Sequence, residues 1–420
     1  MPQENKKKER VKKMIKFGKW VVKFRIPILI LSFLLLIPTG IIYMNTRINY
    51  DILSYLPGDI ETMKGQDILL DEFGTGAFSV AVIDGMQEKE ISQLEDKLKE
   101  IDHVKDVLWY GALADISIPM DMLPDDLKDS LQNADTGSQL MIITFDTSMS
   151  ADETLDAIEE IRGLTNEQCL LSGMSAVVTD IKKICNSEVI MYVVIAAGLS
   201  ALVLALTMDS FLLPFIFLLS IGMAIVYNLG TNFIAGEISF VTQALAAVLQ
   251  LAVTMDYSIF LWHSYLENQE RYPDDRKRAM SHAISQTLTS VVGSSITTIA
   301  GFLAMCFMTF TLGMDLGVVM AKGVVFGVIG CVTILPSMIL AMDKWIEKTR
   351  HKAIIPDLGR IGGFVTKHYW IFIILFLVII GPAFYGQNHN QVYYDLMGTL
   401  PDNLESVKAG NALENDFDMG

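Results

Sequence analysis

Asp256 is a carboxylic acid inside an otherwise apolar segment, ALAAVLQLAVTMDYSIFLW. Tyr257 follows it, and Gln250 and Thr254 precede it within two helical turns. An ionisable group at the centre of a membrane span costs about 2.5–3.5 kcal/mol on insertion scales. A carboxyl group removed from water holds a proton more readily, and reversible protonation is what coupling to a proton gradient requires. We favour this proton-relay interpretation over a purely structural hydrogen bond because of the cost of keeping the charge.

A stripe of hydroxyl side chains in the next apolar segment could extend a proton path. Thr287, Ser290, Ser294 and Thr298 are spaced by three, four and four residues, which places them on one face of a helix. Hydroxyls in such a stripe either hold helices together or line a water path. Packing is the more common use, but a stripe opposite Asp256 would supply hydrogen-bonding steps for a proton.

Lys322 is the second ionisable residue within an apolar segment, GVVMAKGVVFG. It lies near the outer end of its expected span, so its long side chain could reach the membrane interface, which is the interpretation we favour. The other interpretation is a counter-charge in the outer half of the bundle. Neither Asp256 nor Lys322 requires a metal or an organic cofactor, and the expected coupling ion is the proton alone.

The elements that must position these residues are membrane helices. The 420-residue chain is 51% hydrophobic and only 19% charged, whereas ordinary soluble domains carry about 25% charged residues. Several segments approach or exceed the roughly 20 apolar residues that cross a bilayer. The expected spans are residues 26–44, 189–207, 211–229, 238–262, 286–309, 317–341 and 369–386.

The distribution of charge orients these spans. Residues 1–25 hold ten Lys/Arg and two Glu, which places the N-terminus in the cytoplasm and the chain in the cytoplasmic membrane. Because this basic run adjoins a span, we expect no nucleic-acid partner. Alternation then places residues 45–188 outside, and these hold 29 Asp/Glu against ten Lys/Arg. Such an acidic surface favours cationic amphiphiles, although solubility alone is an equally good explanation.

The outer segment has the pattern of two successive βαβ units. Alternating or β-rich runs and helical spacing predict strands at 77–83, 104–110, 140–145 and 169–171 and helices at 89–101, 151–161 and 174–185. This order predicts a ferredoxin-like α+β porter domain joined to the helix bundle. Residues 112–137 are expected to form an irregular excursion. The segment has no nucleophile arranged with a base, so we expect no enzyme activity.

The four cysteines indicate neither a metal site nor a dense disulfide framework. Cys169, Cys185, Cys306 and Cys331 lack a C-x-x-C or Cys/His spacing. Cys306 and Cys331 are expected to pack in the membrane. Cys169 and Cys185 could pair on an oxidising side, but we favour two reduced thiols.

An internal repeat appears when the chain is shifted by 344 residues. Residues 49–76 then align without gaps to residues 393–420. The identities are Tyr50/Tyr394, Asp51/Asp395, Leu56/Leu400, Pro57/Pro401, Glu61/Glu405, Lys64/Lys408, Leu69/Leu413, Phe73/Phe417 and Gly76/Gly420. One repeat is therefore six spans plus one outer domain, as in parallel-repeat transporters. We expect a second repeat, from the same polypeptide or a second chain, to complete the protein.

The repeat divides the chain into seven parts. These are a basic tail (1–25), a first span (26–44), an outer domain (45–188), a five-span bundle (189–341), a basic amphipathic linker (342–368), a seventh span (369–386) and the start of a second outer domain (387–420).

These residues resemble the resistance-nodulation-division (RND) superfamily, and within it the MMPL-like branch of Gram-positive bacteria. The likeness is carried by MDYSIFL at 255–261, SSITTIAGFLAM at 294–305 and ILPSMI at 334–339. It implies a proton-driven exporter of lipids or of hydrophobic and amphiphilic compounds, with membrane lipids as neighbours and a possible homotrimer. It also implies that Asp256 and Tyr257 form half of a relay completed by the second repeat. Ala252 and Thr254 depart from the glycines that often precede the Asp-Tyr pair.

Two other functions share this architecture. A lipid- or sterol-sensing relative would bind lipid without proton dependence. A SecD/SecF-like accessory to protein export also has six-span halves, but its fourth helix usually reads Asp-Ala-Asn, whereas this chain reads Asp256-Tyr257-Ser258. We rank this last alternative lowest.

Overall fold

The computed structural model describes residues 2–109, 132–133, 136–351, 359–390 and 397–419. Most of the irregular excursion expected at 112–137 lies outside these residues. Within them, seven helices are long and apolar enough to cross a membrane, and each overlaps one of the expected spans. They are α2 (Arg25–Met44), α8 (Met174–Thr207), α9 (Leu213–Gly230), α10 (Phe240–Arg271), α11 (Arg276–Ala304), α12 (Leu312–Ile329) continued by η5 (Gly330–Ile334) and α13 (Leu335–Lys348), and α15 (Tyr369–Asn388).

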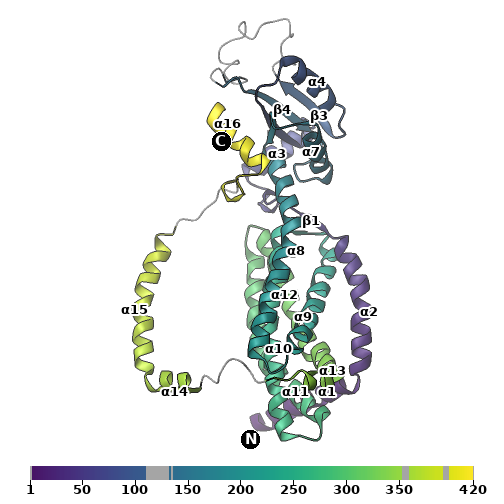
Figure 1. The fold of residues 1–420 in the computed structure, drawn as a ribbon, viewed down its shortest axis with the longest axis vertical. Helices are drawn as coiled ribbons and strands as arrows, with labels where there is room; N and C mark the ends of the chain where they lie inside the picture. Colours follow the sequence, from purple (N-terminus) through teal and green to yellow (C-terminus); the bar gives the residue numbers. More distant parts are fainter. Residues whose placement is uncertain (1, 110–131, 134–135, 352–358, 391–396, 420) are drawn as a thin grey trace.

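Six of these helices form one bundle, and α15 stands apart from it (Figure 1). The spans that include α9 and α12 are the most buried and form the centre of the bundle. Close approaches occur at small residues: a Cβ on Gly230 of α9 would lie 2.3 Å from the carbonyl oxygen of Thr39 on α2. The helix α1 (Pro2–Lys23) crosses the end of the bundle near the N-terminus and packs on α11.

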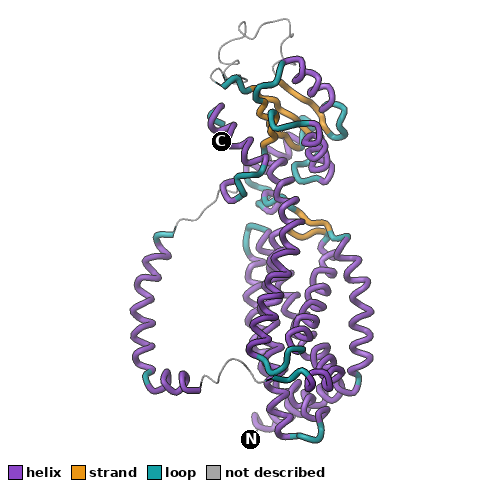
Figure 2. The backbone as a smooth tube through the Cα atoms, in the orientation of Figure 1, coloured by secondary structure: helices purple, strands orange, loops and turns teal. Residues whose placement is uncertain are grey.

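A smaller domain with all four long strands lies beyond the opposite end of the bundle (Figure 2). Its sheet has the order β3-β4-β2-β5, with every neighbouring pair antiparallel. The strands are β2 (Ala77–Ile83), β3 (Val104–Trp109), β4 (Gln139–Phe145) and β5 (Cys169–Ser172), and the helices between them are α4 (Glu88–Leu98) and α7 (Asp152–Leu164). The two helices share one core with one face of the sheet, centred on Ile91, Ile158, Trp109 and Phe145.

The helix α8 joins this outer domain to the membrane without a break. It runs for 34 residues, and its first turns are buried in the outer domain. The boundary expected between residues 188 and 189 therefore lies within one continuous helix. Gly173 precedes α8 with φ of +104°, and a Cβ there would lie 3.1 Å from the Cα of Ser79. Only glycine fits this entry without strain.

The internal repeat is visible in the elements as well as in the sequence. Helix α15 begins and ends 344 residues after α2. The short helix η6 (Met397–Thr399) and helix α16 (Glu405–Phe417) likewise start 344 residues after η1 (Leu53–Tyr55) and α3 (Glu61–Asp71). A short helix, α14 (Gly359–Lys367), precedes α15 as α1 precedes α2. The two copies have the same local structure over this stretch.

Helix α16, from the second copy, packs on the outer domain of the first copy. Leu413 contacts Val82 and Leu140, whose side chains alternate with those of the α4/α7 core and so lie on the other face of the sheet. The Glu405 carboxylate accepts a hydrogen bond from the backbone N–H of Leu171 at 3.1 Å. Helix α16 thus covers the part of the second face around Val82 and Leu140, while Phe78, Leu108 and Ile142 on that face stay exposed.

A buried arginine connects α16 to the domain. Arg162 donates two hydrogen bonds to Asp180 on α8, at 2.7 and 3.0 Å, and its Nε lies 3.3 Å from a Glu405 oxygen. Asp180 in turn accepts from the backbone N–H of Ser406 at 3.3 Å. Three elements, α7, α8 and α16, therefore meet at one charge cluster.

The cysteines are free thiols in positions that differ in environment. Cys169 is buried in β5, where burial and the nearby Glu405 raise the pKa of its thiol to about 12. Cys185 lies on α8 beside Tyr50 and Val178. Cys331 is buried in the bundle, and Cys306 is partly exposed at its outer end.

We expect Arg162→Met to destabilise the outer domain by about 3–5 kcal/mol, because Asp180 would remain buried without its counter-charge. Hydrogen exchange of the full chain, read by mass spectrometry in β5 and α16, measures this. The control is Lys182→Met, which removes a pair with the largely exposed Asp152 and should cost less than about 1 kcal/mol. Equal protection losses in the two variants would contradict the structural role of the cluster.

Candidate functional site

Asp256 lies near the middle of α10 and is exposed on the outside of the described bundle. Ala252 and Phe260, one turn away on either side, share the exposed face. The described residues give Asp256 no hydrogen bond and no ion pair. A carboxylate at this depth, directed away from its own bundle, requires a polar partner that the six helices do not supply.

The Tyr257 side chain lies in the bundle core, although Tyr257 adjoins the exposed Asp256 in the sequence. Consecutive residues on a helix are rotated by about 100°, and Tyr257 is buried in the bundle core. Its backbone carbonyl accepts a weak hydrogen bond from the Cys331 thiol at 3.3 Å. The structure therefore does not bring the two side chains of the expected relay pair into one hydrogen bond.

Gln250 and Thr254 form a polar seam between α10 and its neighbours α9 and α12. The Asn228 amide on α9 donates to the Gln250 side-chain oxygen at 2.9 Å, and both residues are buried. Two glycines of α12 allow this contact: a Cβ on Gly323 would lie 2.7 Å from the Asn228 nitrogen, and one on Gly327 would lie 2.5 Å from the Thr254 hydroxyl. The seam lies inside the bundle, on the side away from the exposed face of Asp256.

Asn228 was not predicted as a site residue from the sequence. An amide inside the apolar segment LPFIFLLSIGMAIVYNLG was the available signal, because an uncharged polar side chain in a span also needs a partner.

The hydroxyl stripe of α11 is divided between buried and exposed positions. Thr287 is buried, and its hydroxyl has no partner among the described residues. Ser290 and Ser294 are exposed, and Thr298 is half-buried and donates to the backbone of Ser294 at 3.2 Å. Because α11 packs along α10, exposed polar side chains occur on two neighbouring membrane helices.

Lys322 lies towards the outer end of the bundle. Its ammonium group donates to the Asn232 side chain in η3 (Thr231–Ala235), which follows α9. Nearby, Asp315 in the first turn of α12 accepts hydrogen bonds from the backbone N–H of Ser239 at 2.9 Å and from the Thr242 hydroxyl at 2.7 Å. Lys322 and Asp256 thus have separate surroundings.

A second group of buried polar residues lies where the first span enters the outer domain. A short parallel pair, β1 (Arg47–Asn49) with β6 (Glu237–Ser239), ties this entry to the start of α10. Tyr50 follows β1, stacks on Phe240 at 5.8 Å and donates to Asn186 on α8 at 3.0 Å. We call this region the junction.

Asp51 is the buried carboxylate of the junction, with 5% of its surface exposed. It accepts a hydrogen bond from the backbone N–H of Leu53 at 2.8 Å. Burial raises the pKa of Asp51, and the hydrogen bonds oppose this shift only in part. Burial also raises the pKa of Tyr50 to about 12. Both residues recur in the second copy, as Asp395 and Tyr394, which lie outside the described residues.

These features define an integral membrane protein with a helical bundle and an extramembrane α/β domain inserted after the first span. The model of the MMPL family matches residues 74–368, and the chain belongs to this family. Its curated relatives include proteins named as a transport protein and an exporter.

Curated relatives agree with this membership. The chain is 24% identical to the probable transport protein MmpL12 of Mycobacterium tuberculosis, over 84% of this chain and 30% of the relative. It is 20% identical to the apo-petrobactin exporter of Bacillus anthracis, over 87% of this chain and 55% of the relative. The chain therefore spans only about a third to a half of these proteins. Among solved structures, SecDF matches 78% of the chain with 14% identity and a TM-score of 0.42.

The raised pKa of Asp51 predicts a pH-dependent stability. The folded protein keeps this proton to a higher pH than the unfolded chain does, so stability falls as pH rises from about 4 through the folded-state pKa. We expect Asp51→Asn to melt progressively higher than the wild type as pH increases from 4 to 7. Thermal unfolding of the full chain in detergent tests this.

Asp59→Asn is the control, because Asp59 is an exposed carboxylate in the same segment. It should leave the pH profile unchanged. If the melting difference between Asp51→Asn and the wild type stays constant with pH, ionisation of Asp51 does not oppose folding.

Proposed function

We propose that the protein exports lipids or other hydrophobic and amphiphilic compounds across the cytoplasmic membrane, driven by the proton gradient, with Asp256 as the protonated group. In this proposal the N-terminus and α1 lie in the cytoplasm and the outer domain lies on the other side. The outer domain acts as a ferredoxin-like porter domain. The ferredoxin-like assignment is supported by the β-α-β-β-α-β order of the domain and by its antiparallel sheet in the order β3-β4-β2-β5.

One observation carries the proposal: polar side chains are exposed on α10 and α11 among apolar ones such as Phe260 and Ile296. Asp256, Ser290 and Ser294 are exposed on these two helices, and Gly293 of α11 faces open space. Ionisable residues in membranes face a bundle interior or a water-filled cavity rather than lipid. Small and hydroxyl residues are typical of helix–helix contacts. This face is therefore suited to an interface with a second bundle, where Asp256 would find its relay partner.

The comparison of α3 with α16 supports a second repeat as that partner. Leu413 of α16 is 8% exposed against the sheet, whereas its equivalent Leu69 on α3 is 46% exposed. Glu405 of α16 pairs with Arg162 and accepts a hydrogen bond from the backbone of β5. Its equivalent on α3, Glu61, has no ion pair among the described residues. The same helix is docked in one copy and uncovered in the other. We propose that α3 docks on the outer domain of the second repeat as α16 docks on the first.

An apolar cavity supports the choice of substrate class. It has a volume of about 500 Å³ and lies between α3 and β2, next to the start of α8. Its lining includes Leu53, Ile68, Leu69, Phe78, Met149 and Met174. Cavities of this size and character accept hydrophobic molecules. A second outer domain docked on α3 would enclose this cavity between two domains.

Neutralising Asp256 is the central test. We expect Asp256→Asn to abolish export driven by an imposed proton gradient in proteoliposomes of the complete protein, a loss of at least about 100-fold, because the amide cannot take up a proton. Asp256→Glu, which keeps the titratable group, should retain part of the activity. A fluorescent amphiphile as substrate and a pH-sensitive dye in the lumen report transport and proton movement together.

Glu267→Gln is the matched control, since Glu267 lies on the same helix α10 and pairs with Arg271 near its cytoplasmic end. It should export normally. If Asp256→Asn transports with unchanged proton dependence, the relay assignment is wrong. If Asp256→Asn binds the amphiphile, and neither Asp256→Asn nor the wild type moves protons, the protein is better described by the lipid-sensing alternative.

The docking of α3 is tested by photo-crosslinking in cells that make the complete protein. A photoreactive residue at Leu69 should crosslink to the sheet of a second outer domain, on the same polypeptide or on another chain. A photoreactive residue at Leu413 is the positive control and should crosslink to residues 139–172. Asp67, on the opposite face of α3, is the negative control. Crosslinks from Leu69 only to lipid would contradict the proposed docking.

A further inference from the structure

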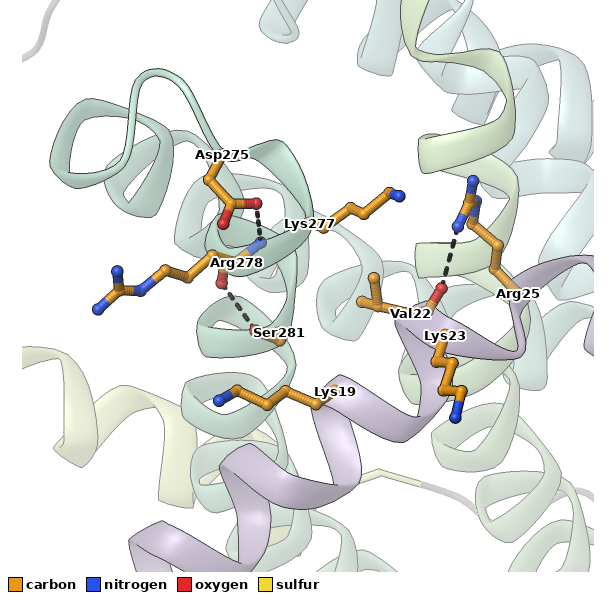
Figure 3. A pocket seen from close by; sticks show the side chains of 8 residues that line it. All are labelled: Lys19, Val22, Lys23, Arg25, Asp275, Lys277, Arg278 and Ser281. Atoms are coloured by element: carbon orange, nitrogen blue, oxygen red, sulfur yellow. Dashed lines mark hydrogen bonds between the residues drawn. The ribbon is translucent and has the colours of Figure 1, made fainter.

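A cluster of cations surrounds a cavity of about 570 Å³ at the end of the bundle opposite the outer domain. Lys19 and Lys23 come from α1, Arg25 starts α2, and Lys277 and Arg278 lie in the first turn of α11. Figure 3 shows Lys277 extending from α11 towards Arg25, with Lys19 below Ser281. In the described part of the chain, none of these five cations forms an ion pair. Their mutual repulsion favours a bound anion.

Among the described residues that line the cavity, the one acidic side chain is already engaged. The Asp275 carboxylate caps α11 by accepting a hydrogen bond from the backbone N–H of Arg278 at 2.9 Å. The Arg278 guanidinium stacks over the Tyr272 ring at 4.3 Å, and in Figure 3 it points away from Lys277 and Arg25. Lys23 lies over the Phe24 ring at 5.5 Å and Arg25 donates to Val22, so Lys19 and Lys277 are the cavity cations with no such contact among the described residues.

The two sides of the cavity are held at a fixed separation. Gly18 of α1 packs directly on α11: a Cβ there would lie 2.3 Å from the carbonyl oxygen of Ser281. Arg25 donates to the carbonyl of Val22 at 3.2 Å, which fixes the turn between α1 and α2. The cations thus belong to a packed site formed by helices far apart in the sequence, and not to a disordered basic tail.

Apolar surface continues from the cavity along the first span. The Trp20 and Phe24 rings pack in a tilted arrangement with their centroids 5.6 Å apart and are 51% and 38% exposed, and aromatic residues of this kind are typical of the membrane–water interface. Ile26 and Ile30 of α2 are 48% and 63% exposed. A ligand at the cations therefore has an apolar path beside it, directed into the membrane.

We propose that this cavity binds the phosphate headgroup of an anionic phospholipid, whose acyl chains lie along α2. The phosphate contacts Lys19, Lys23, Arg25 and Lys277, and the apolar side chains of α2 contact the chains. Basic pockets between membrane helices are suited to such headgroups. A soluble phosphate ester has the same charge but leaves the exposed face of α2 uncovered, which is why we commit to the lipid.

The test uses the full chain in nanodiscs of phosphatidylcholine with increasing phosphatidylglycerol, and native mass spectrometry to count the lipids retained. The wild type should retain phosphatidylglycerol in preference to phosphatidylcholine. The double variant Lys19→Gln/Lys277→Gln should lose about 25-fold in this preference, from about 1 kcal/mol for each cation near a membrane surface.

Lys12→Gln/Lys16→Gln is the charge-matched control. Both lysines are exposed on α1 and line no part of the cavity, so this variant should keep the wild-type preference. Equal losses in the two variants would assign the effect to general basic charge and overturn the site. Unchanged retention in Lys19→Gln/Lys277→Gln would also overturn it. Displacement of phosphatidylglycerol by millimolar glycerol phosphate would assign the cavity to soluble esters instead of lipid.

Discussion

Polar groups inside a bilayer have no water to bind, and this constraint organises the membrane part of the protein. Most polar side chains of the bundle satisfy it locally. Asn228 donates to Gln250, and Lys322 donates to Asn232 near the outer end. Asp256 is different because its own six helices give it no partner. Under the proposed function, the need to satisfy this one carboxylate would make the exposed face of α10 an interface with a second bundle.

Because the sequence repeats, the need for polar partners concerns two repeats and not one bundle alone. The chain contains one complete unit and the first elements of another, and the second set contacts the first unit. Because α3 and α16 have the same sequence pattern but opposite exposure, the proposed docking of α3 would make the two copies exchange helices rather than stand side by side. An exchange of this kind makes each outer domain depend on residues from the other repeat. Folding of one unit is then incomplete until the other is present.

Apolar length predicted the seven spans, because about 20 apolar residues have few alternatives to crossing a membrane. Short β-rich runs predicted β2 and β4, and the shift of 344 residues predicted that the seventh span repeats the first. The direction of the Asp256 side chain was not predictable, because α10 is apolar on nearly every side and its periodicity does not distinguish lipid from protein. The end of the outer domain was missed for a related reason: helical spacing continues across residue 188 while only the surroundings change. The packing of α16 on β5 depends on tertiary contacts that no local pattern records.

The continuity of α8 has a mechanical consequence. At 1.5 Å per residue, its 34 residues form a rod about 50 Å long. One end lies against α9 and α10 at the side of the bundle, and the other carries Asp180, which touches both α7 and α16. The rod has no hinge and no proline, so a small tilt in the bilayer becomes a larger sideways displacement at its far end. Under the proposed function, such a rod would transmit a change beside Asp256 to the contact between the two repeats, without a flexible linker between them.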